Sequence, residues 1–150
     1  MKITFLRHGR RNFTLGDVPL NEQGLQEARS LATNPALQDV ETILSSPKLR
    51  SLMTIEPLSI KLQRKPIIQE SLDQMRSGES ESIFHDRVQN FLKKLEQGTW
   101  ASPILLCSHS DWLSMAVSII PTDALNLPGT MFDCSEFMTF EIKQGIWTLQ

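Results

Sequence analysis

Three short segments of the chain carry apolar residues on both faces of an extended backbone. They span Ile3 to Leu6, Val40 to Leu44 and Pro103 to Cys107. Runs of this length without polar alternation are typical of strands that are covered on both sides of a mostly parallel sheet. We therefore expect these three segments to form central strands.

Apolar residues at helical spacing follow each of these runs. Asn21 is placed to cap a helix that ends near Leu31, and Pro47 suits the first turn of a second helix. A third helix is expected from Ser80 to Leu95, and a fourth is expected from Ser110, as its cap, up to Pro121. The residues expected on the buried faces of the four helices are Leu25, Ala28, Leu31 and Ala32; Leu49, Leu52, Met53 and Leu58; Ile83, Val88, Phe91, Leu92 and Leu95; and Leu113, Val117 and Ile120.

The C-terminal region has the pattern of a β-hairpin. Residues 136–142 and 146–149 are two strand-like stretches that flank Gly145. Strands that alternate with helices indicate an α/β fold. The sequence therefore predicts a three-layer α/β/α sandwich with a mostly parallel central sheet, an antiparallel C-terminal edge and a single domain over residues 1–150.

Composition narrows the possible partners and the compartment. The net charge of −2 gives no global attraction to nucleic acid or to an anionic membrane, so any phosphate site must be a local cluster. The chain has no long apolar run and no signal-like N-terminus, and Cys107 and Cys134 lack metal-like spacing. We expect a cytoplasmic protein with reduced thiols, and neither nucleic acid nor membrane among its partners. Its oligomeric state is left open.

Residues suited to phosphate follow the three expected central strands. Arg7 and His8 come directly after the first strand, Arg50 lies one helical turn beyond the second, and His109 follows the third. Ligands of open α/β sheets bind outside the carboxyl ends of the strands. We therefore expect these four side chains to meet in one pocket.

The chemistry of this set fits phosphoryl transfer. Two arginines can hold the charged equatorial oxygens of a phosphoryl group through forked hydrogen bonds. A histidine attacks phosphorus only through an unprotonated nitrogen, and neighbouring positive charge disfavours the imidazolium form of His8. Because guanidinium groups supply the positive charge, we expect neither a metal nor another cofactor.

The order of several motifs resembles the histidine phosphatase superfamily, whose fold is that of phosphoglycerate mutase. The triplet Arg7-His8-Gly9 is similar to the signature of that family, and Ser108-His109 resembles its second catalytic histidine. Three further segments match in order along the chain. They are residues 17–24, similar to D-x-P-L-T-x-x-G with Asn21 in place of Thr; residues 45–50, similar to S-S-x-x-x-R; and residues 78–80 followed by Arg87, similar to G-E-S and its arginine.

The resemblance implies a role for each matching residue. His8 is implied to be the phosphorylated nucleophile, and Arg7, Arg50 and His109 to bind the phosphate. The general acid of the family lies in an L-x-E segment, which we assign here to residues 68–70, with Glu70 as the acid. Glu79 is the alternative acid.

Additional substrate contacts are expected around these residues. Gly9 allows the backbone to approach the ligand closely. Asn12 and Thr14 compete for a polar position after the signature triplet, and Ser110 follows the second histidine. The short segment between Glu70 and the G-E-S motif implies a minimal cap and an open pocket, as in the compact branch of the family that includes bacterial phosphohistidine phosphatases.

The sequence thus predicts a metal-independent phosphatase that acts on phosphomonoesters or on phosphoprotein through a phosphohistidine at His8. Two alternatives remain open. One is phosphoryl transfer of the phosphoglycerate mutase type, which requires a lid that we do not expect this short chain to build. The other is a non-catalytic module that binds a phosphorylated small molecule or phosphoprotein.

Overall fold

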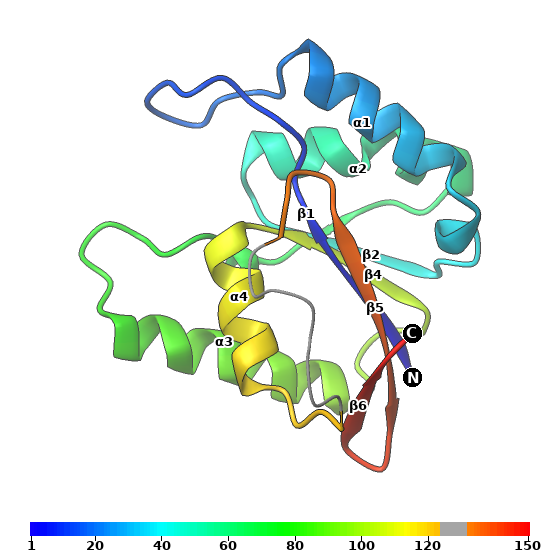
Figure 1. Cartoon of the computed structure of the whole chain (residues 1–150), viewed down its shortest axis with the longest axis vertical. Coiled ribbons are helices and arrows are strands. Elements are labelled where there is room, and N and C mark those ends of the chain that lie inside the picture. The colour runs from blue at the N-terminus through cyan, green and yellow to red at the C-terminus, as the bar shows by residue number, and fades with distance from the viewer. Residues whose placement is uncertain (124–131) are drawn as a thin grey trace.

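A six-stranded sheet lies at the centre of the computed structural model, which describes residues 1–123 and 132–150 (Figure 1). The strand order is β3-β2-β4-β1-β5-β6. The pairs between β3, β2, β4 and β1 are parallel, and β5 and β6 are antiparallel, as the sequence predicts. The strands are β1 (Lys2–Arg7), β2 (Thr42–Ser45), β3 (Ile67–Ile68), β4 (Ile104–Ser108), β5 (Phe137–Lys143) and β6 (Ile146–Leu149).

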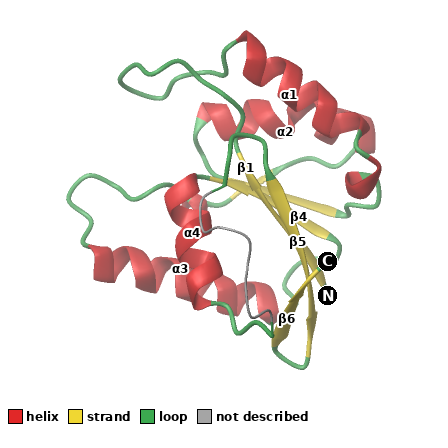
Figure 2. Cartoon of the chain, viewed as in Figure 1, coloured by secondary structure: helices red, strands yellow, loops and turns green. Residues whose placement is uncertain are grey.

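Helices cover both faces of the sheet and complete the expected three layers (Figure 2). On one face lie α1 (Glu22–Thr33) and α2 (Leu49–Leu62), and on the other lie α3 (Glu81–Glu96) and α4 (Ser110–Ile119). Two short 3₁₀ turns, η1 (Pro35–Leu37) and η2 (Glu70–Leu72), connect these elements. Within the described ranges, none of the helices has both the length and the apolar character needed to cross a bilayer.

Strand register brings the ends of the central strands to the same edge of the sheet. Arg7 pairs with Ser108, and Ser45 pairs with Cys107. The next residues continue this alignment, because the amide of His8 donates to the carbonyl of Ser108 over 3.1 Å. The residues that follow β1, β2 and β4 therefore lie together, as the parallel pattern predicts.

Two hydrophobic cores hold the helices on the sheet. The core under α3 and α4 contains interlocking aromatic rings, with Phe5 within 6.2 Å of the Trp112 ring centroid and within 5.8 Å of the Trp147 centroid. The smaller core under α1 and α2 is mainly aliphatic. Since burial of such side chains is the main favourable term in folding, these cores fix the strand ends that carry the polar site.

The buried faces of two helices differ from those the sequence predicts. In α3, Ile83 is 59% exposed and Phe84 takes its place in the core. In α2, Leu58 is buried as expected, whereas Leu49 is exposed and the polar residues Arg50 and Thr54 face inward. The first turns of α2 therefore serve the polar site rather than the apolar core.

Smaller features of the fold also depart from the predicted boundaries. His109, not Ser110, is the N-cap residue of α4, and Ser110 is its first helical residue. Asn21 does cap α1, because its side chain accepts from the amide of Gly24. The short edge strand β3 has no counterpart in the sequence prediction, because its two isoleucines are exposed and too few to form a pattern.

Gly24 allows α1 to lie directly against the chain that follows the first strand. A Cβ atom at this position would lie 2.9 Å from the amide nitrogen of Arg10 and closer still to its carbonyl oxygen. That carbonyl is also held in place by the amide of Asn21, over 2.9 Å. The glycine therefore fixes the segment that carries Arg10 and Arg11.

We expect Gly24→Ala to lower the free energy of unfolding by about 1–3 kcal/mol, the usual cost of overpacking, because backbone atoms cannot rotate out of the way. Chemical denaturation of the two proteins measures this difference. Gln26→Ala, an exposed change in the same helix, is the matched control and should alter stability by no more than about 0.5 kcal/mol. Equal stabilities of the glycine and alanine proteins would contradict the close approach.

Candidate active site

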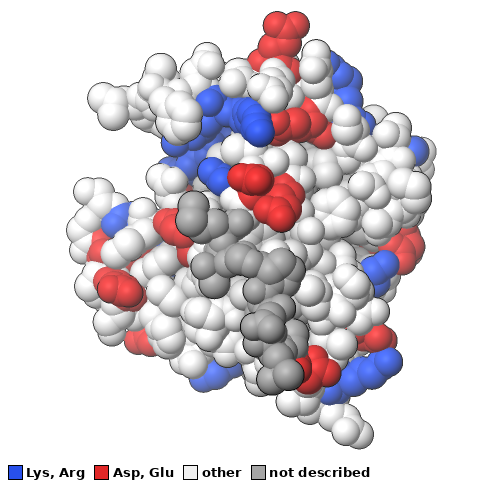
Figure 3. Space-filling view, viewed as in Figure 1, with Lys and Arg blue, Asp and Glu red and all other residues white. Residues whose placement is uncertain are grey.

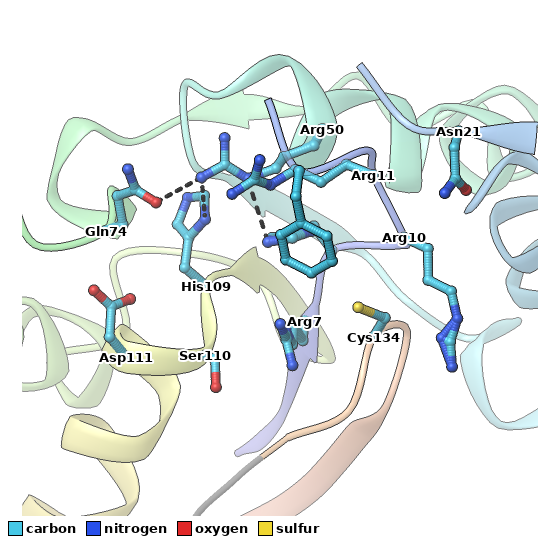
Figure 4. Close-up of a pocket in the computed structure, with 12 residues that line it drawn as sticks. Arg7, Arg10, Arg11, Asn21, Arg50, Gln74, His109, Ser110, Asp111 and Cys134 are labelled. Carbon is cyan, nitrogen blue, oxygen red and sulfur yellow. Dashed lines mark hydrogen bonds between the residues drawn. The ribbon is translucent and has the colours of Figure 1, made fainter. Parts of the chain in front are cut away.

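A cavity of about 520 Å³ opens at the carboxyl edge of the parallel strands, where three chain segments meet. It contains four of the five residues that the sequence predicts to be catalytic. Figure 4 shows three of these four, with Arg50 above the two segments that carry Arg7 and His109. The residues that line the cavity are Arg7, His8, Arg10, Arg11, Phe13, Asn21, Arg50, Gln74, His109, Ser110, Asp111 and Cys134.

His8 lines the cavity and is held in one tautomer, with one protonated and one unprotonated ring nitrogen. Its Nδ1 lies 2.8 Å from the carbonyl oxygen of Gly9, which can only accept, so Nδ1 carries the proton. The other ring nitrogen, Nε2, then has a lone pair, and it accepts from Nε of Arg50 over 3.3 Å. Gly9 is fixed in turn by Thr54, whose Oγ1 accepts from its amide at 2.8 Å.

The surroundings of His8 keep its ring neutral. Burial lowers the pKa of His8 from its ordinary value of 6.5 to about 4, and the positive charges of Arg50 and Arg7 act in the same direction. The hydrogen bond to Gly9 opposes this shift without reversing it. At neutral pH the imidazole is therefore an unprotonated base, as a nucleophile requires.

Arg50 lies between the two histidines and contacts both. Its Nη2 donates to Oε1 of Gln74 over 2.6 Å and to Nδ1 of His109 over 3.2 Å. The side chain is only 2% exposed, and burial lowers its pKa from the usual value. The nearest carboxylate to its guanidinium among the described residues is that of Asp17, at 4.0 Å on a half-exposed side chain. The site thus holds a poorly compensated buried cation.

His109 completes the floor of the cavity. Its Nδ1 accepts from Arg50, so Nε2 carries the proton and donates to Oγ of Ser46 over 2.7 Å. Burial, followed by the charge of Arg50, lowers the pKa of His109 from 6.5 to about 2. The two imidazole rings lie 5.2 Å apart between centroids, and both are neutral at physiological pH.

Arg7 offers a second guanidinium to the cavity. Its Nη1 donates to the carbonyl of Phe132 over 2.5 Å, which positions the side chain. Its Nε is buried and has no hydrogen-bond partner among the described atoms. A buried donor without a partner is costly, and an anionic ligand oxygen would satisfy it.

Glu70 does not line the cavity. Its side chain is 74% exposed and pairs with Arg76 at 3.1 Å. The alternative acid, Glu79, is also outside the cavity, in a 2.7 Å ion pair with Arg87. The hydrogen bonds from Arg87 hold the pKa of Glu79 at about 2, so this group stays ionised.

Gln74 lines the cavity, whereas neither of the acids expected from the sequence, Glu70 and Glu79, does so. The buried leucine of this region is Leu72, two residues before Gln74. Residues 71 and 72 are anchored by their carbonyls, which accept from Trp112 and Ser108 over 2.7 and 2.6 Å. The sequence pattern does not indicate the η2 turn, which decides which side chain of this segment faces the cavity.

Asp111 is the carboxylate that does line the cavity. It is exposed in the first turn of α4, and Figure 4 shows it beside Gln74 and His109. Its Oδ2 accepts from the amide of Met75 over 2.9 Å, and its Oδ1 accepts from the amide of Trp112 over 2.8 Å. These contacts tie the segment that carries Gln74 to the start of α4.

The expected substrate-binding residues are placed unevenly. Ser110 lines the cavity, and Gly9 lies behind His8, packed against the backbone of Gly24. Asn12 and Thr14 are exposed in the loop beyond Arg11 and do not line the cavity. Among the lining residues that the sequence did not assign to the site are Phe13 and Gln74. They come from the loops on either side of the cavity, where no periodic pattern indicates which way a side chain points.

Comparison with known proteins agrees with this fold and motif order. The family model of the histidine phosphatase superfamily (branch 1) matches residues 3–83. The chain therefore belongs to the histidine phosphatase superfamily, as the ordered motifs predict. None of the curated proteins compared with the chain matches its sequence.

Several solved structures share the fold over almost the whole chain. A putative alpha-ribazole-5'-P phosphatase from Escherichia coli is 20% identical, with a TM-score of 0.86, and the match covers 100% of this chain and 95% of that one. The protein histidine phosphatase SixA, complexed with tungstate, is 23% identical, with a TM-score of 0.77 and coverages of 100% and 94%. A phosphoserine phosphatase from Entamoeba histolytica, in complex with 3-phosphoglyceric acid, is 17% identical, with a TM-score of 0.79 and coverages of 99% and 94%.

We expect acidification from pH 7.5 to pH 5 to destabilise the protein, with His109 contributing about 2 kcal/mol of the loss. A buried histidine with a pKa of about 2 stays neutral in the folded state, whereas in the unfolded chain it takes up a proton below pH 6.5. Its contribution to stability is therefore complete above pH 6.5 and is lost as the pH falls.

Urea denaturation at the two pH values measures this effect. In His109→Gln, the fall in unfolding free energy should be smaller by about 2 kcal/mol. His85→Gln is the matched control, because it removes a histidine of α3 that does not line the cavity. It should show the full fall in unfolding free energy. The full fall in His109→Gln as well would show that His109 does not titrate in this way.

Proposed function

We propose that this protein is a phosphatase that transfers the phosphoryl group of its substrate to Nε2 of His8 and then releases it to water. One observation carries the proposal. A neutral imidazole lines the cavity together with the guanidinium groups of Arg7 and Arg50, and its Nε2 lone pair accepts from Arg50. This combination provides a nucleophile and the positive charge that a transferring phosphoryl group requires.

The first step forms one bond and breaks another. The Nε2 lone pair of His8 attacks phosphorus, and the bond to the leaving atom breaks with its electron pair on that atom. The Nδ1 proton stays on the ring, where the Gly9 carbonyl stabilises the positive charge that develops on the imidazole. Arg50 and Arg7 exchange their present contacts for the equatorial oxygens of the phosphoryl group.

The second step returns the enzyme to its starting state. A water molecule attacks phosphorus on the phosphohistidine, and the P–N bond breaks with its electron pair returning to Nε2. One proton of the water is released to solvent with the phosphate. We propose that His109 helps to bind the phosphoryl group in both steps, for which its Nε2–H exchanges Ser46 for a phosphoryl oxygen; its ring lies 5.2 Å from that of His8 between centroids.

The proton donor for the leaving atom is the weakest part of this site. We propose that Gln74 stands in place of a general acid here, and an amide has no acidic proton to give. The carboxylate of Asp111, which also lines the cavity, is engaged by the amides of Met75 and Trp112. Glu70 is too far outside the cavity to act unless the chain rearranges. We therefore propose that the preferred substrates have leaving groups that need little protonation, such as the imidazole of phosphohistidine or an acidic phenol.

The similar structures are consistent with this choice. Those named above are described as phosphatases, and one is described as a protein histidine phosphatase. Because their identities to this chain are only 17–23%, these structures show a shared fold and do not single out a substrate. The second candidate function is a module that binds phosphorylated ligands in the same cavity and does not turn them over, because a general acid is lacking.

We expect His8→Ala to reduce hydrolysis of p-nitrophenyl phosphate by at least about a thousand-fold, because the nucleophile is lost. Incubation with a labelled phosphodonor, followed by rapid quenching, should leave an acid-labile, alkali-stable label on the unchanged protein only. His85→Ala retains His8 and serves as the matched control, with full labelling. Substantial hydrolysis by His8→Ala would rule out the covalent route, whereas phosphate binding without turnover by the unchanged protein would favour the binding module.

We expect Gln74→Glu to raise the rate on alkyl phosphates, such as phosphoserine, by about tenfold or more, a part of what a placed general acid contributes. The rate on p-nitrophenyl phosphate should change much less, because its leaving group needs little protonation. Steady-state kinetics on both substrates measures the difference. Glu70→Gln is the matched control and should leave both rates as they are; a large loss on alkyl phosphates in Glu70→Gln would instead make Glu70 the acid.

A further inference from the structure

Two loops project past the carboxyl edge of the sheet (Figure 1). One is the segment of residues 12–19 after β1, and the other is the segment of residues 73–80 before α3. Each contributes to the cavity wall, through Phe13 and Gln74 respectively. Any group attached to a bound phosphoryl group therefore leaves the cavity between these loops.

The first loop is anchored at its base and middle. Arg11 and Leu20 form an isolated antiparallel bridge, and the carboxylate of Asp17 accepts from the amide of Leu49 over 2.9 Å. This carboxylate also lies 4.0 Å from Arg50. These contacts anchor the chain on both sides of the tip of the loop.

The tip of this loop presents apolar side chains to solvent. Phe13 is 98% exposed and Leu15 is fully exposed, so they have the two highest exposures among the large hydrophobic residues of the described chain. On the opposite loop, Met75 is also exposed. Exposed apolar groups that border a binding cavity are typical of interaction sites, whereas single ones scattered elsewhere need no explanation.

Positive charge lies between this apolar tip and the cavity. Figure 3 shows basic side chains gathered at the hollow beside the projecting loops. Arg10 is paired with Glu27 at 3.2 Å, but Arg11 has no carboxylate partner within the described ranges and lies 5.9 Å from the Phe13 ring centroid. The cavity mouth is therefore complementary to acidic and apolar groups at the same time.

We propose that the loop of residues 12–19 docks a phosphorylated protein, whose acidic and apolar side chains beside the phosphorylated residue contact Arg11, Phe13 and Leu15. This inference rests on the proposed phosphatase function and assigns its substrate class. A small metabolite held in the cavity has no means of reaching Leu15, which lies beyond the residues that line it. Burial of these apolar groups favours a macromolecular substrate over a small one.

The test compares two short phosphohistidine peptides, one with glutamate and leucine beside the phosphorylated residue and one with glycine and serine there. The protein should prefer the first peptide by about fivefold or more in kcat/KM, mainly through KM. Leu15→Ser should remove most of that preference and leave kcat/KM for p-nitrophenyl phosphate unchanged. Ile60→Ser, which removes an equally large exposed residue from α2, is the matched control and should keep the preference.

Equal rates on the two peptides, or an unchanged preference in Leu15→Ser, would overturn docking by the loop while leaving the phosphatase function intact. The p-nitrophenyl phosphate reaction tests the function alone, so failure of the function appears there separately. If no substrate is turned over, fluorescence anisotropy with the same peptides carrying a stable phosphonate decides the matter. Tighter binding of the glutamate and leucine peptide, lost in Leu15→Ser, supports docking, and equal binding contradicts it.

Discussion

The buried guanidinium of Arg50 is the feature on which the rest of the site depends. It is almost completely withdrawn from water, and its nearest described carboxylate lies 4.0 Å away on a half-exposed side chain. Burying a charge without close compensation costs free energy that the surrounding packing has to offset. The same charge, together with burial, keeps His8 and His109 neutral. A doubly negative phosphoryl group would relieve this cost, so the site is arranged for an anion before any substrate arrives.

The central fold and four of the site residues follow from simple sequence patterns. Parallel strands place their carboxyl ends at one edge, so residues after β1, β2 and β4 had to meet once those strands were recognised. The inward turn of α2 was harder to predict. A helix normally buries its apolar stripe, but here Arg50 and Thr54 face the interior because they hold His8 and Gly9 in place.

The general acid could not be assigned from sequence, because the path of a loop decides which side chain of residues 70–74 faces the cavity. The η2 turn directs Leu72 into the core, where Trp112 and Ser108 bind the adjacent carbonyls, and this turn leaves Glu70 in solvent and brings Gln74 to the cavity. No periodicity marks such a turn in advance. The same limit applies to the loop of residues 12–19, whose exposed tip is visible only once its anchors are known.

The central claim is that His8 is a neutral imidazole whose Nε2 receives the phosphoryl group, and ¹⁵N NMR of the histidine-labelled protein tests it most directly. At pH 7 the account predicts a proton on Nδ1 and a lone pair on Nε2 of His8. After addition of a phosphodonor it predicts a one-bond ¹⁵N–³¹P coupling at Nε2, with none at either nitrogen of His109. An imidazolium at His8 at pH 7, or consumption of the donor with the coupling at another nitrogen, would contradict the account.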